Sequence, residues 1–281
     1  MNQPESSSKL TPKQALSPTP ALYAELVGDG MEQLAAASMS CIGPLPPGAL
    51  LHDVGCGLGA ATAAASAIAN ASEVSIGIKG TDINNDALDV YRRTAAEQNW
   101  PAEGLRMDAA ALEFPGQTFS HAIGNALLFV LPNDGIGAVK EIHRTLKPGG
   151  VAVVNSWAYA AAKRTRPAGT PLPRQGLEKW ERAEFVKEVV VKGGFSADNV
   201  TLTQRSVYVT VGDVRHFATM LWSFIGGTSS AGWLESDEEN WARAVGIVAE
   251  ELEKTDEYER LDEQHSKFKF VANIAVAVKQ E

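Results

Sequence analysis

Short apolar runs and stretches of helical periodicity alternate through residues 49–157. The apolar runs have the length of β-strands and lie at 49–54, 73–82, 105–107, 121–125 and 151–156. An alanine-rich stretch after the glycines at 55–59, and amphipathic stretches at 86–99 and 135–146, predict the helices between them. Strands that alternate with helices predict a mainly parallel sheet with helices on both faces. We therefore expect an α/β fold.

The regions on either side of this core have other patterns. Residues 1–20 are rich in Ser, Pro, Gln and Lys and are expected to form a disordered tail, followed by an N-terminal cap helix within 21–48 that starts at Leu22 and ends before the prolines. After the core, the pattern predicts helices at 177–192, 214–225, 237–254 and 256–264 and strands at 200–211 and 267–278. We expect one domain over 21–281, with a core at 49–157, a lid region at 158–266 and a final strand within 267–281.

The charge balance limits the partners. The chain has 281 residues, 44% of them hydrophobic, and a net charge of −9, with no stripe of Lys and Arg that could neutralise a phosphate backbone. Cys41 and Cys56 lack metal-ligand spacing. The N-terminus lacks a signal-peptide pattern, and the apolar stretch 217–227 is too short for a bilayer. We expect a cytoplasmic protein that binds no metal, nucleic acid or membrane.

A glycine-rich loop follows the first predicted strand. Gly55, Gly57 and Gly59 stand at a turn from strand to helix, where glycine permits positive φ and lets a ligand approach the backbone. Together with Ala60 they satisfy the dinucleotide fingerprint, and Asp82 ends the second strand at the expected distance. The loop alone therefore does not distinguish NAD from S-adenosylmethionine.

Three further features favour S-adenosylmethionine. Asp53 precedes the first glycine by two positions, where a carboxylate would repel a diphosphate and attract an ammonium or sulfonium group. Asp108 ends the third strand, where its oxygen could accept a hydrogen bond from an adenine amino group. A Leu-Lys-Pro-Gly-Gly turn at 146–150 leads into the fifth strand.

The segments LLHDVGCGLGAAT, GTDIN, RMDAAAL and EIHRTLKPGGVAVVNSW resemble successive motifs of class I S-adenosylmethionine-dependent methyltransferases over about residues 50–157. Within that class the chain is similar to ubiquinone- and menaquinone-type enzymes and to fungal secondary-metabolite methyltransferases of the gliotoxin dithiol S-methyltransferase group. The resemblance implies a Rossmann-like seven-stranded sheet of order 3-2-1-4-5-7-6 with strand 7 antiparallel. It also implies S-adenosylhomocysteine as a product. The helices predicted between the last two strands, at 214–264, indicate a helical lid inserted there.

The resemblance further implies a set of cofactor contacts at the ends of the first four strands. These residues are Asp53, Gly55, Gly57, Gly59, Asp82, Ile83, Asp108, Ala109, Asn125 and Ala126. The glycines would pass beneath the methionine part, with Asp53 linked to its amino group. Asp82 would hold both ribose hydroxyls and Ile83 would pack on adenine. Asp108 and the Ala109 amide would read the adenine edge.

The fourth strand end carries the remaining contacts and one departure. Asn125 would offer its backbone carbonyl to the amino group, and Ala126 would lie beside the methyl path. The apolar stretch 126–131 lacks an Asn-Pro-Pro-Tyr-like sequence, which disfavours nucleic acid and protein glutamine as substrates. His52 is a second departure, because the family has an apolar or small residue there.

Candidate acceptor contacts are mostly apolar and aromatic. They are Tyr23, Trp157, Tyr159, Phe217, Met220, Leu221, Trp222 and Phe224. Ordinary core packing is the competing interpretation of these residues. If they line a pocket, the acceptor is an apolar or aromatic small metabolite. His216 and His265 are the candidate bases for an acceptor that must lose a proton.

Two alternatives stay open at this point. An NAD(P)-dependent oxidoreductase fits the loop, and Tyr159 and Lys163 have the Tyr-x-x-x-Lys spacing, but without the serine and strand-to-helix context. A methyltransferase-fold protein could also bind the cofactor without methyl transfer. For the favoured function, in-line displacement needs chiefly alignment and exclusion of water. The methylated atom (O, N, S or C) and the oligomeric state are left open.

Overall fold

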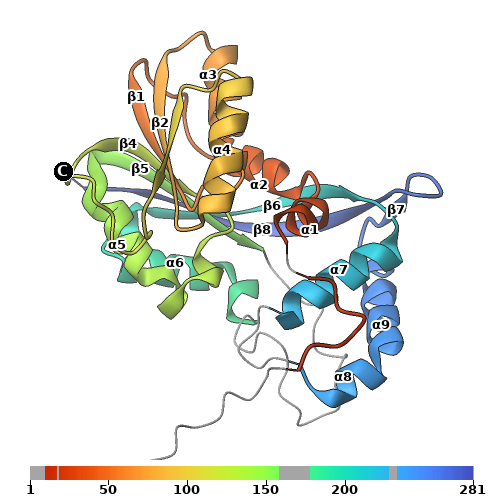
Figure 1. Cartoon of the computed structure of the whole chain (residues 1–281). Helices are drawn as coiled ribbons and strands as arrows, with labels where there is room; N and C mark the ends of the chain where they lie inside the picture. The colour runs from red at the N-terminus through yellow and green to blue at the C-terminus, as the bar shows by residue number, and fades with distance from the viewer. Residues whose placement is uncertain (1–9, 18, 158–177, 228–232, 281) are drawn as a thin grey trace, which may run out of the picture. The chain divides into compact units, whose positions relative to one another are not determined.

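In the computed structural model of the chain, residues 10–17, 19–157, 178–227 and 233–280 are described. Tyr159 and the neighbouring lysine and arginines lie outside these ranges. The strands form one sheet in the order β3-β2-β1-β4-β5-β8-β6, with the short β7 paired to β8 (Figure 1). Their bounds are β1 Ala49–Val54, β2 Ile76–Asp82, β3 Ala102–Arg106, β4 Phe119–Gly124, β5 Leu146–Trp157, β6 Val200–Val211, β7 Glu259–Arg260 and β8 Ser266–Val278.

Strand directions match the expectation. β1 pairs in parallel with β2 and β4, and β4 pairs in parallel with β5. β8 runs antiparallel to β5 and takes the place of the seventh strand. The Rossmann-like α/β fold with an antiparallel last strand is therefore confirmed.

Helices occupy both faces of the sheet. The helices between strands β1 and β6 are α3 Ala60–Ala71, α4 Asn85–Glu97, α5 Ile136–Thr145 and α6 Ala183–Lys192, with short 3-10 turns Leu128–Val130, Pro132–Gly135, Glu178–Glu181 and Ala197–Asn199. α3 and α4 lie on one face and α5 and α6 on the other (Figure 1). The other helices are α1 Pro20–Val27, α2 Gly30–Met39, α7 Val214–Gly227, α8 Glu235–Glu239 and α9 Trp241–Glu253. The helical insertion between the last two long strands is confirmed.

The described chain forms two compact units. The first, here called the sheet unit, holds 29–157, 179–208 and 270–280. The second, here called the helical unit, holds 10–28, residue 178 and 209–269, with the gaps stated above. The domain boundaries expected from the sequence stay predictions.

Two element predictions are wrong, and a third, the single helix expected at 237–254, is two helices, α8 and α9, separated at Asn240. The expected single N-terminal helix is two helices, because Gly28 stands between them at φ 48°, where an added Cβ would lie 2.9 Å from the Thr210 carbonyl oxygen. The expected helix at 256–264 is instead β7 and a tight turn. Asp262 Oδ1 accepts the N–H groups of Gln264 and His265 at 2.7 and 2.8 Å, and this side-chain capping competes with helix formation.

The core beneath the loops of the sheet unit is apolar. Leu51, Ile78 and Ile123 from the central strands pack with Ala61 and Ala65 of α3, and all of these side chains are buried. This packing fixes the carboxyl ends of β1, β2 and β4 relative to one another. Among the described residues, no helix combines the length and the apolar character needed to cross a bilayer.

Candidate functional site

The glycine loop after β1 adopts the left-handed backbone expected of it. Gly55, Gly57 and Gly59 have φ of 65°, 51° and 101°. A Cβ on Gly55 would lie 2.5 Å from Leu127, and one on Gly59 would lie 2.7 Å from Trp100. A Cβ on Gly57 would meet nothing within 4 Å. Gly57 is therefore the glycine whose bare side faces open space, as a ligand cradle requires.

Asp82 at the end of β2 is bonded to this loop. Its Oδ2 accepts the Gly57 N–H at 3.0 Å, and its Oδ1 accepts the Asn84 N–H at 2.9 Å. A carboxylate has about four acceptor positions, so these two bonds leave room for ligand hydroxyls. Ile83 beside it is 62% exposed, which is unusual for a large apolar side chain and suits a surface for a flat ring. The structure thus brings two predicted binding segments together.

Asp53 lies beneath the loop and not on its surface. The side chain is buried, and Oδ2 accepts from the Thr62 N–H at 3.0 Å and from Thr62 Oγ1 at 2.7 Å. Burial raises the pKa of Asp53 to about 6, the Thr62 bonds oppose this rise, and the nearby Asp82 charge adds to it. Tyr91 Oη lies 2.8 Å from Thr62 Oγ1 and extends the network. Sequence reasoning missed Thr62 and Tyr91.

Tyr91 also explains two glycines outside the loop. A Cβ at Gly80 or Gly104 would lie 2.5 or 2.9 Å from the Tyr91 ring. The ring is fully buried under the loop and needs those bare backbone positions. The signal in the sequence was a tyrosine on the apolar face of a helix together with glycines inside two strands, which is too weak to identify a site.

The loop after β3 carries Asp108 and Ala109. Asp108 is exposed, its Oδ1 accepts the Ala110 N–H at 2.8 Å, and its carbonyl accepts the Ala111 N–H at 2.9 Å. The Met107 N–H donates to the Asp82 carbonyl at 3.1 Å, which joins this loop to the end of β2. The predicted adenine contacts therefore lie on the same edge of the sheet as Asp82.

Asn125 and Ala126 are held by an amide network. Asn155 donates to Asn125 Oδ1 at 2.8 Å and to Ser38 Oγ at 2.7 Å, and its Oδ1 accepts the Ala126 N–H at 2.7 Å. Asn125 donates to the Met31 carbonyl at 3.1 Å. Ala126 has a φ of 53°, a strained conformation that these bonds maintain. Sequence reasoning missed Asn155, because its partners are far away in the chain.

His52, the departure in β1, has a structural explanation. Its ring is fully buried, stacks on Phe119 at 4.7 Å between ring centroids, and lies 2.9 Å through Nε2 from Thr81 Oγ1. Burial lowers the pKa of His52 to about 3, so the ring is neutral. His52 thus packs in the core next to the end of β2.

The aromatic acceptor candidates mostly lie in the helical unit. The acceptor candidates in this unit are Tyr23, Phe217, Met220, Leu221, Trp222 and Phe224. Phe217, Met220 and Trp222 are at most 5% exposed, whereas Leu221 and Phe224 are half-buried. Tyr23 packs on Phe224 at 5.6 Å. Trp157 belongs to the sheet unit and packs on Phe270 at 5.7 Å. Their contact with an acceptor stays a proposal.

The two candidate bases lie in the helical unit and each is paired with a carboxylate. His216 Nε2 lies 2.8 Å from Glu25 Oε1, and His265 Nδ1 lies 2.9 Å from Asp262 Oδ2. Both imidazoles are about half exposed. His265 also lines a cavity of about 240 Å³ within this unit, with Asp213 and Glu250 among its other charged walls.

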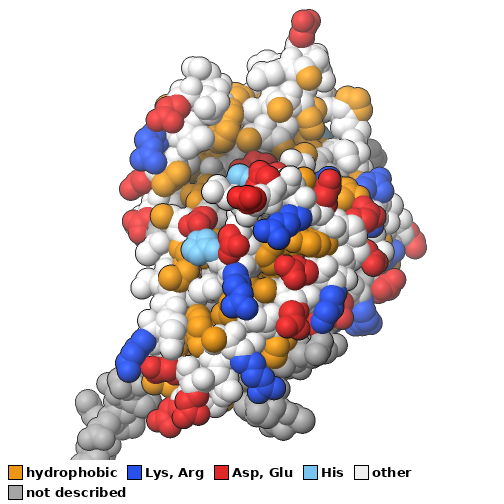
Figure 2. All heavy atoms as spheres, turned by 90° about the vertical axis from the view of Figure 1, so that its right-hand side faces the viewer, with side chains coloured by type: hydrophobic (Ala, Val, Ile, Leu, Met, Phe, Trp, Pro, Cys, Tyr) orange, Lys and Arg blue, Asp and Glu red, His pale blue; other side chains and the backbone are white. Residues whose placement is uncertain are grey.

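Charged side chains of both signs are interspersed over the face drawn in Figure 2, without a continuous basic patch on that face. Within the described ranges, no group of three or more His, Cys, Asp or Glu side chains is placed to hold a metal ion. These observations concern the described residues only, and the expected lack of a nucleic-acid partner stays a prediction.

Residues 52–150 match the family described as a methyltransferase domain. The 2-methyl-6-phytyl-1,4-hydroquinone methyltransferase of Synechocystis sp. is 29% identical over 157 residues, which cover 54% of this chain and 46% of that protein. The chain therefore spans about half the length of this curated relative.

Two solved structures extend the comparison to the rest of the chain. Phosphoethanolamine N-methyltransferase 2 of Haemonchus contortus, in complex with phosphomonomethylethanolamine and S-adenosylhomocysteine, gives a TM-score of 0.55 at 17% identity and covers 93% of this chain and 57% of its own. The cyclase SpnF gives a TM-score of 0.51 at 20% identity and covers 90% of this chain and 82% of its own. Identities this low show a shared fold.

Proposed function

We propose that this chain transfers the methyl group of S-adenosylmethionine to an apolar or aromatic small molecule, because residues 52–150 match the family described as a methyltransferase domain. The observation that carries the proposal is the bond from the Gly57 N–H to Asp82, which joins an open glycine cradle to a carboxylate suited to a ribose. The resemblance to class I methyltransferases and to quinone-methylating enzymes holds, while the likeness to the gliotoxin group stays a prediction.

The residues present fit this cofactor. Gly57 offers backbone next to open space, Asp82 has free acceptor positions, and Ile83 offers an exposed apolar surface to adenine. Asp53 would act on the cofactor's amino group directly or through water, from beneath the loop. The Asn125 carbonyl would accept from the same amino group, and the Asn155 amide would keep that segment in place.

When bound, S-adenosylmethionine supplies an electrophilic methyl group on a sulfonium that is already a good leaving group. The protein then has to align the acceptor with that methyl group and exclude water. The strained backbone at Ala126, fixed by Asn155, would give the methyl path a defined wall. A thiolate or enolate acceptor needs no further help from the chain.

A hydroxyl or ammonium acceptor needs a base, and we propose His216 and His265 for that role. Each imidazole has a carboxylate partner that orients it and would stabilise the charge gained with a proton. Replacing each with Gln should lower kcat by about 10²–10⁴-fold for the histidine that acts as base. An unchanged kcat in both folded variants would remove both histidines from the chemistry.

The acceptor proposal rests on apolar side chains and on a related enzyme. The Synechocystis relative is a hydroquinone methyltransferase, and the half-buried Leu221 and Phe224 of α7 offer apolar surface. We propose an aromatic acceptor with apolar substituents. The fold shared with the cyclase SpnF keeps a second candidate open, cofactor binding without methyl transfer.

The test is methyl transfer from methyl-labelled S-adenosylmethionine to an alkylated hydroquinone. We expect labelled product and an equal amount of S-adenosylhomocysteine. Calorimetry with S-adenosylhomocysteine and with NADH is the control, and we expect binding of the first only. Cofactor binding without transfer to hydroquinone, catechol, thiol or amine acceptors would favour the second candidate. Binding of NADH alone would overturn the proposal in favour of an oxidoreductase.

A further inference from the structure

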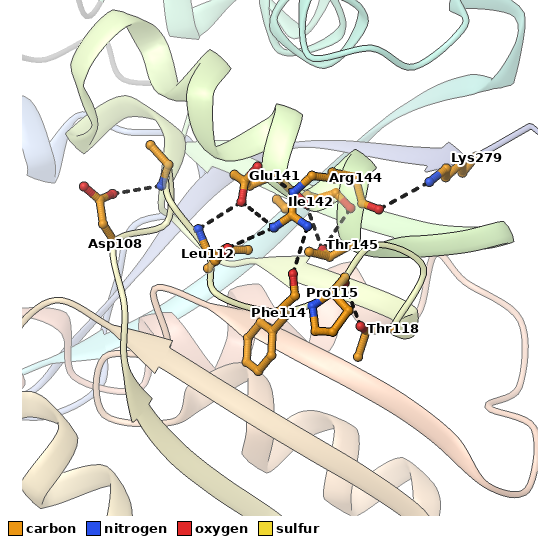
Figure 3. Close-up of polar contacts among 11 residues, drawn as sticks. Asp108, Leu112, Phe114, Pro115, Thr118, Glu141, Ile142, Arg144, Thr145 and Lys279 are labelled. Atoms are coloured by element: carbon orange, nitrogen blue, oxygen red, sulfur yellow. Dashed lines mark hydrogen bonds and ion pairs between the residues drawn. The ribbon is translucent and has the colours of Figure 1, made fainter.

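One face of α5 contacts the loop that joins β3 to β4. Gly137, Glu141 and Arg144 are spaced by four and three residues, which places them on the same face of the helix. Their partners lie within 107–118, the loop that carries Asp108, and Figure 3 shows this loop beside the Glu141 and Arg144 side chains. The contacts join a helix without predicted function to a predicted base-reading segment.

The charged part of this face holds the loop backbone. Arg144 pairs with Glu141 through two bonds, Nε to Oε1 at 2.8 Å and Nη2 to Oε2 at 2.7 Å. Arg144 also donates to the carbonyls of Leu112 and Phe114 at 2.9 and 2.8 Å, and Glu141 Oε2 accepts the Leu112 N–H at 2.9 Å. A planar guanidinium can make this set of bonds, whereas an ammonium group cannot.

The ion pair is ionised over the ordinary pH range. The Arg144 hydrogen bond holds the pKa of Glu141 below its usual value, and the bond from Leu112 acts in the same direction. The Arg144 side chain is 40% exposed and Glu141 17%, so the pair is partly open to solvent. A partly exposed ion pair contributes little to overall stability, so we expect the pair to act by holding the loop in position.

The small residue of the face contacts the loop nearer to Asp108. A Cβ added at Gly137 would lie 3.1 Å from the Ala110 Cβ, tighter than ordinary contact. Ala110 in turn donates its N–H to Asp108 Oδ1 at 2.8 Å. The close approach of Gly137 to Ala110 and the bond from Ala110 to Asp108 thus link the α5 backbone to the Asp108 carboxylate.

We propose that Gly137, Glu141 and Arg144 are positioning residues that set how Asp108 and the Ala109 N–H meet the base, and so make the site selective for adenine. The inference rests on the proposed function. Adenine presents an amino donor where hypoxanthine presents a carbonyl acceptor. A carboxylate held at that edge favours the first and repels the second, whereas a loop free to shift loses the distinction.

The experiment compares calorimetric Kd values for S-adenosylhomocysteine and S-inosylhomocysteine. The wild-type chain is expected to prefer adenine by about tenfold, the effect of one well-placed hydrogen bond. Arg144→Met removes all of the hydrogen-bond donors of the side chain, and Arg144→Lys keeps the positive charge without the planar guanidinium. Arg93→Met on α4 removes an exposed arginine that has no bond to this loop among the described contacts, and serves as the matched control.

Gly137→Ala keeps the proposal testable if the Arg144 variants do not fold. Alanine favours the helix, so the variant should be folded, yet its methyl group presses on Ala110. We expect the adenine preference to fall toward equal binding in Arg144→Met and Gly137→Ala, to fall partly in Arg144→Lys, and to persist in Arg93→Met. Amide exchange at Leu112 in the cofactor-free protein should speed up in Arg144→Met.

The outcomes separate the two proposals. Tight adenine-selective binding by the wild type, kept at the same ratio in folded Arg144→Met and Gly137→Ala, would overturn this inference and leave the proposed function intact. Failure of the wild type to bind either compound would overturn both. If the ratio of the two Kd values falls as much in Arg93→Met as in Arg144→Met, the effect comes from the loss of positive charge alone, and the inference is also overturned.

Discussion

The loop edge of the sheet unit and helix α7 of the helical unit contrast in how their candidate residues are held. At the loop edge, Gly57 and Asp82 carry polar groups that are bonded to each other and still open to a ligand. On α7, Phe217, Met220 and Trp222 are buried in the interior of their own unit. Similar sequence reasoning selected both sets; the first has bonded polar groups beside open space, whereas the contact of the second with an acceptor stays a proposal.

The contrast has a physical cause. A cofactor with a fixed chemical structure needs backbone and carboxylates at set distances, which short motifs at strand ends supply. An apolar acceptor needs only surface of the right shape, and the same side chains that provide it also build ordinary cores. Apolar stripes therefore predict burial, whereas glycines and acids at strand ends predict ligands.

The largest expected effect tests whether α7 is core. Trp222→Ala should lower the free energy of unfolding by about 3–5 kcal/mol, because the indole is 1% exposed and packs on Trp233. Leu221→Ala, at a half-buried position next to it, should cost clearly less. Urea unfolding measures both. Equal losses of unfolding free energy in the two variants would show that exposure does not distinguish Trp222 from Leu221. The contrast between the loop edge and α7 would then not hold for α7.

A pair of glycine variants tests the loop. Gly59→Ala should destabilise the protein by about 3 kcal/mol, the sum of left-handed strain and of contact with Trp100. Gly57→Ala should cost only about 1 kcal/mol of strain, because its Cβ meets nothing. Its methyl group would nevertheless enter the cradle and weaken S-adenosylhomocysteine binding by about tenfold or more. If Gly57→Ala binds as the wild type does, the ligand does not pass over Gly57.

The pH dependence of stability tests the burial of Asp53. Its pKa rises from 3.8 to about 6 on folding, so the folded state binds the extra proton and this contribution is present below pH 3.8 and lost as pH rises through about 6. The change amounts to about 3 kcal/mol at most. The Asn side chain in Asp53→Asn does not titrate, so the difference in unfolding free energy between this variant and the wild type should increase in favour of the variant from pH 4 to pH 6 and then level off.

The same residue gives a smaller effect on binding. An ammonium group near Asp53 favours the ionised carboxylate, which forms as the pH is raised through about 6. The affinity of the wild type for S-adenosylhomocysteine should therefore increase by a few-fold when the pH is raised through this range. Asp53→Asn should remove this rise. Calorimetry at three pH values provides the measurement, and a wild-type affinity that is flat over this range would place the amino group away from Asp53.

Sequence patterns predicted the parts of this structure that depend on neighbouring residues. The expected strands at 49–54 and 200–211 have the observed bounds, because each is a run of strand-forming residues ended by a turn. The left-handed glycines followed from a loop between strand and helix. The end of β5 was placed well, although the strand begins at Leu146, earlier than expected, because the Lys-Pro-Gly-Gly turn is part of it.

Contacts between distant residues were beyond the sequence. The Asn155 network joins α2, the end of β4 and β5, and the Glu141 and Arg144 pair meets a loop about thirty residues earlier in the chain. No local period encodes such pairs. The helix wrongly expected at 256–264 shows the complementary failure, because apolar spacing suggested a helix where Asp262 caps a turn.

Calorimetric titration of S-adenosylhomocysteine into wild type, Asp82→Ala and Asp86→Ala tests the central claim most directly. Asp86 is an exposed acid in the first turn of α4, close to Asp82 in sequence, and serves as the matched control. We expect Asp82→Ala to lose about 1.5–3 kcal/mol of binding for each hydroxyl bond that it gives up, and Asp86→Ala to bind as the wild type does. Undiminished affinity in a folded Asp82→Ala variant would contradict the account.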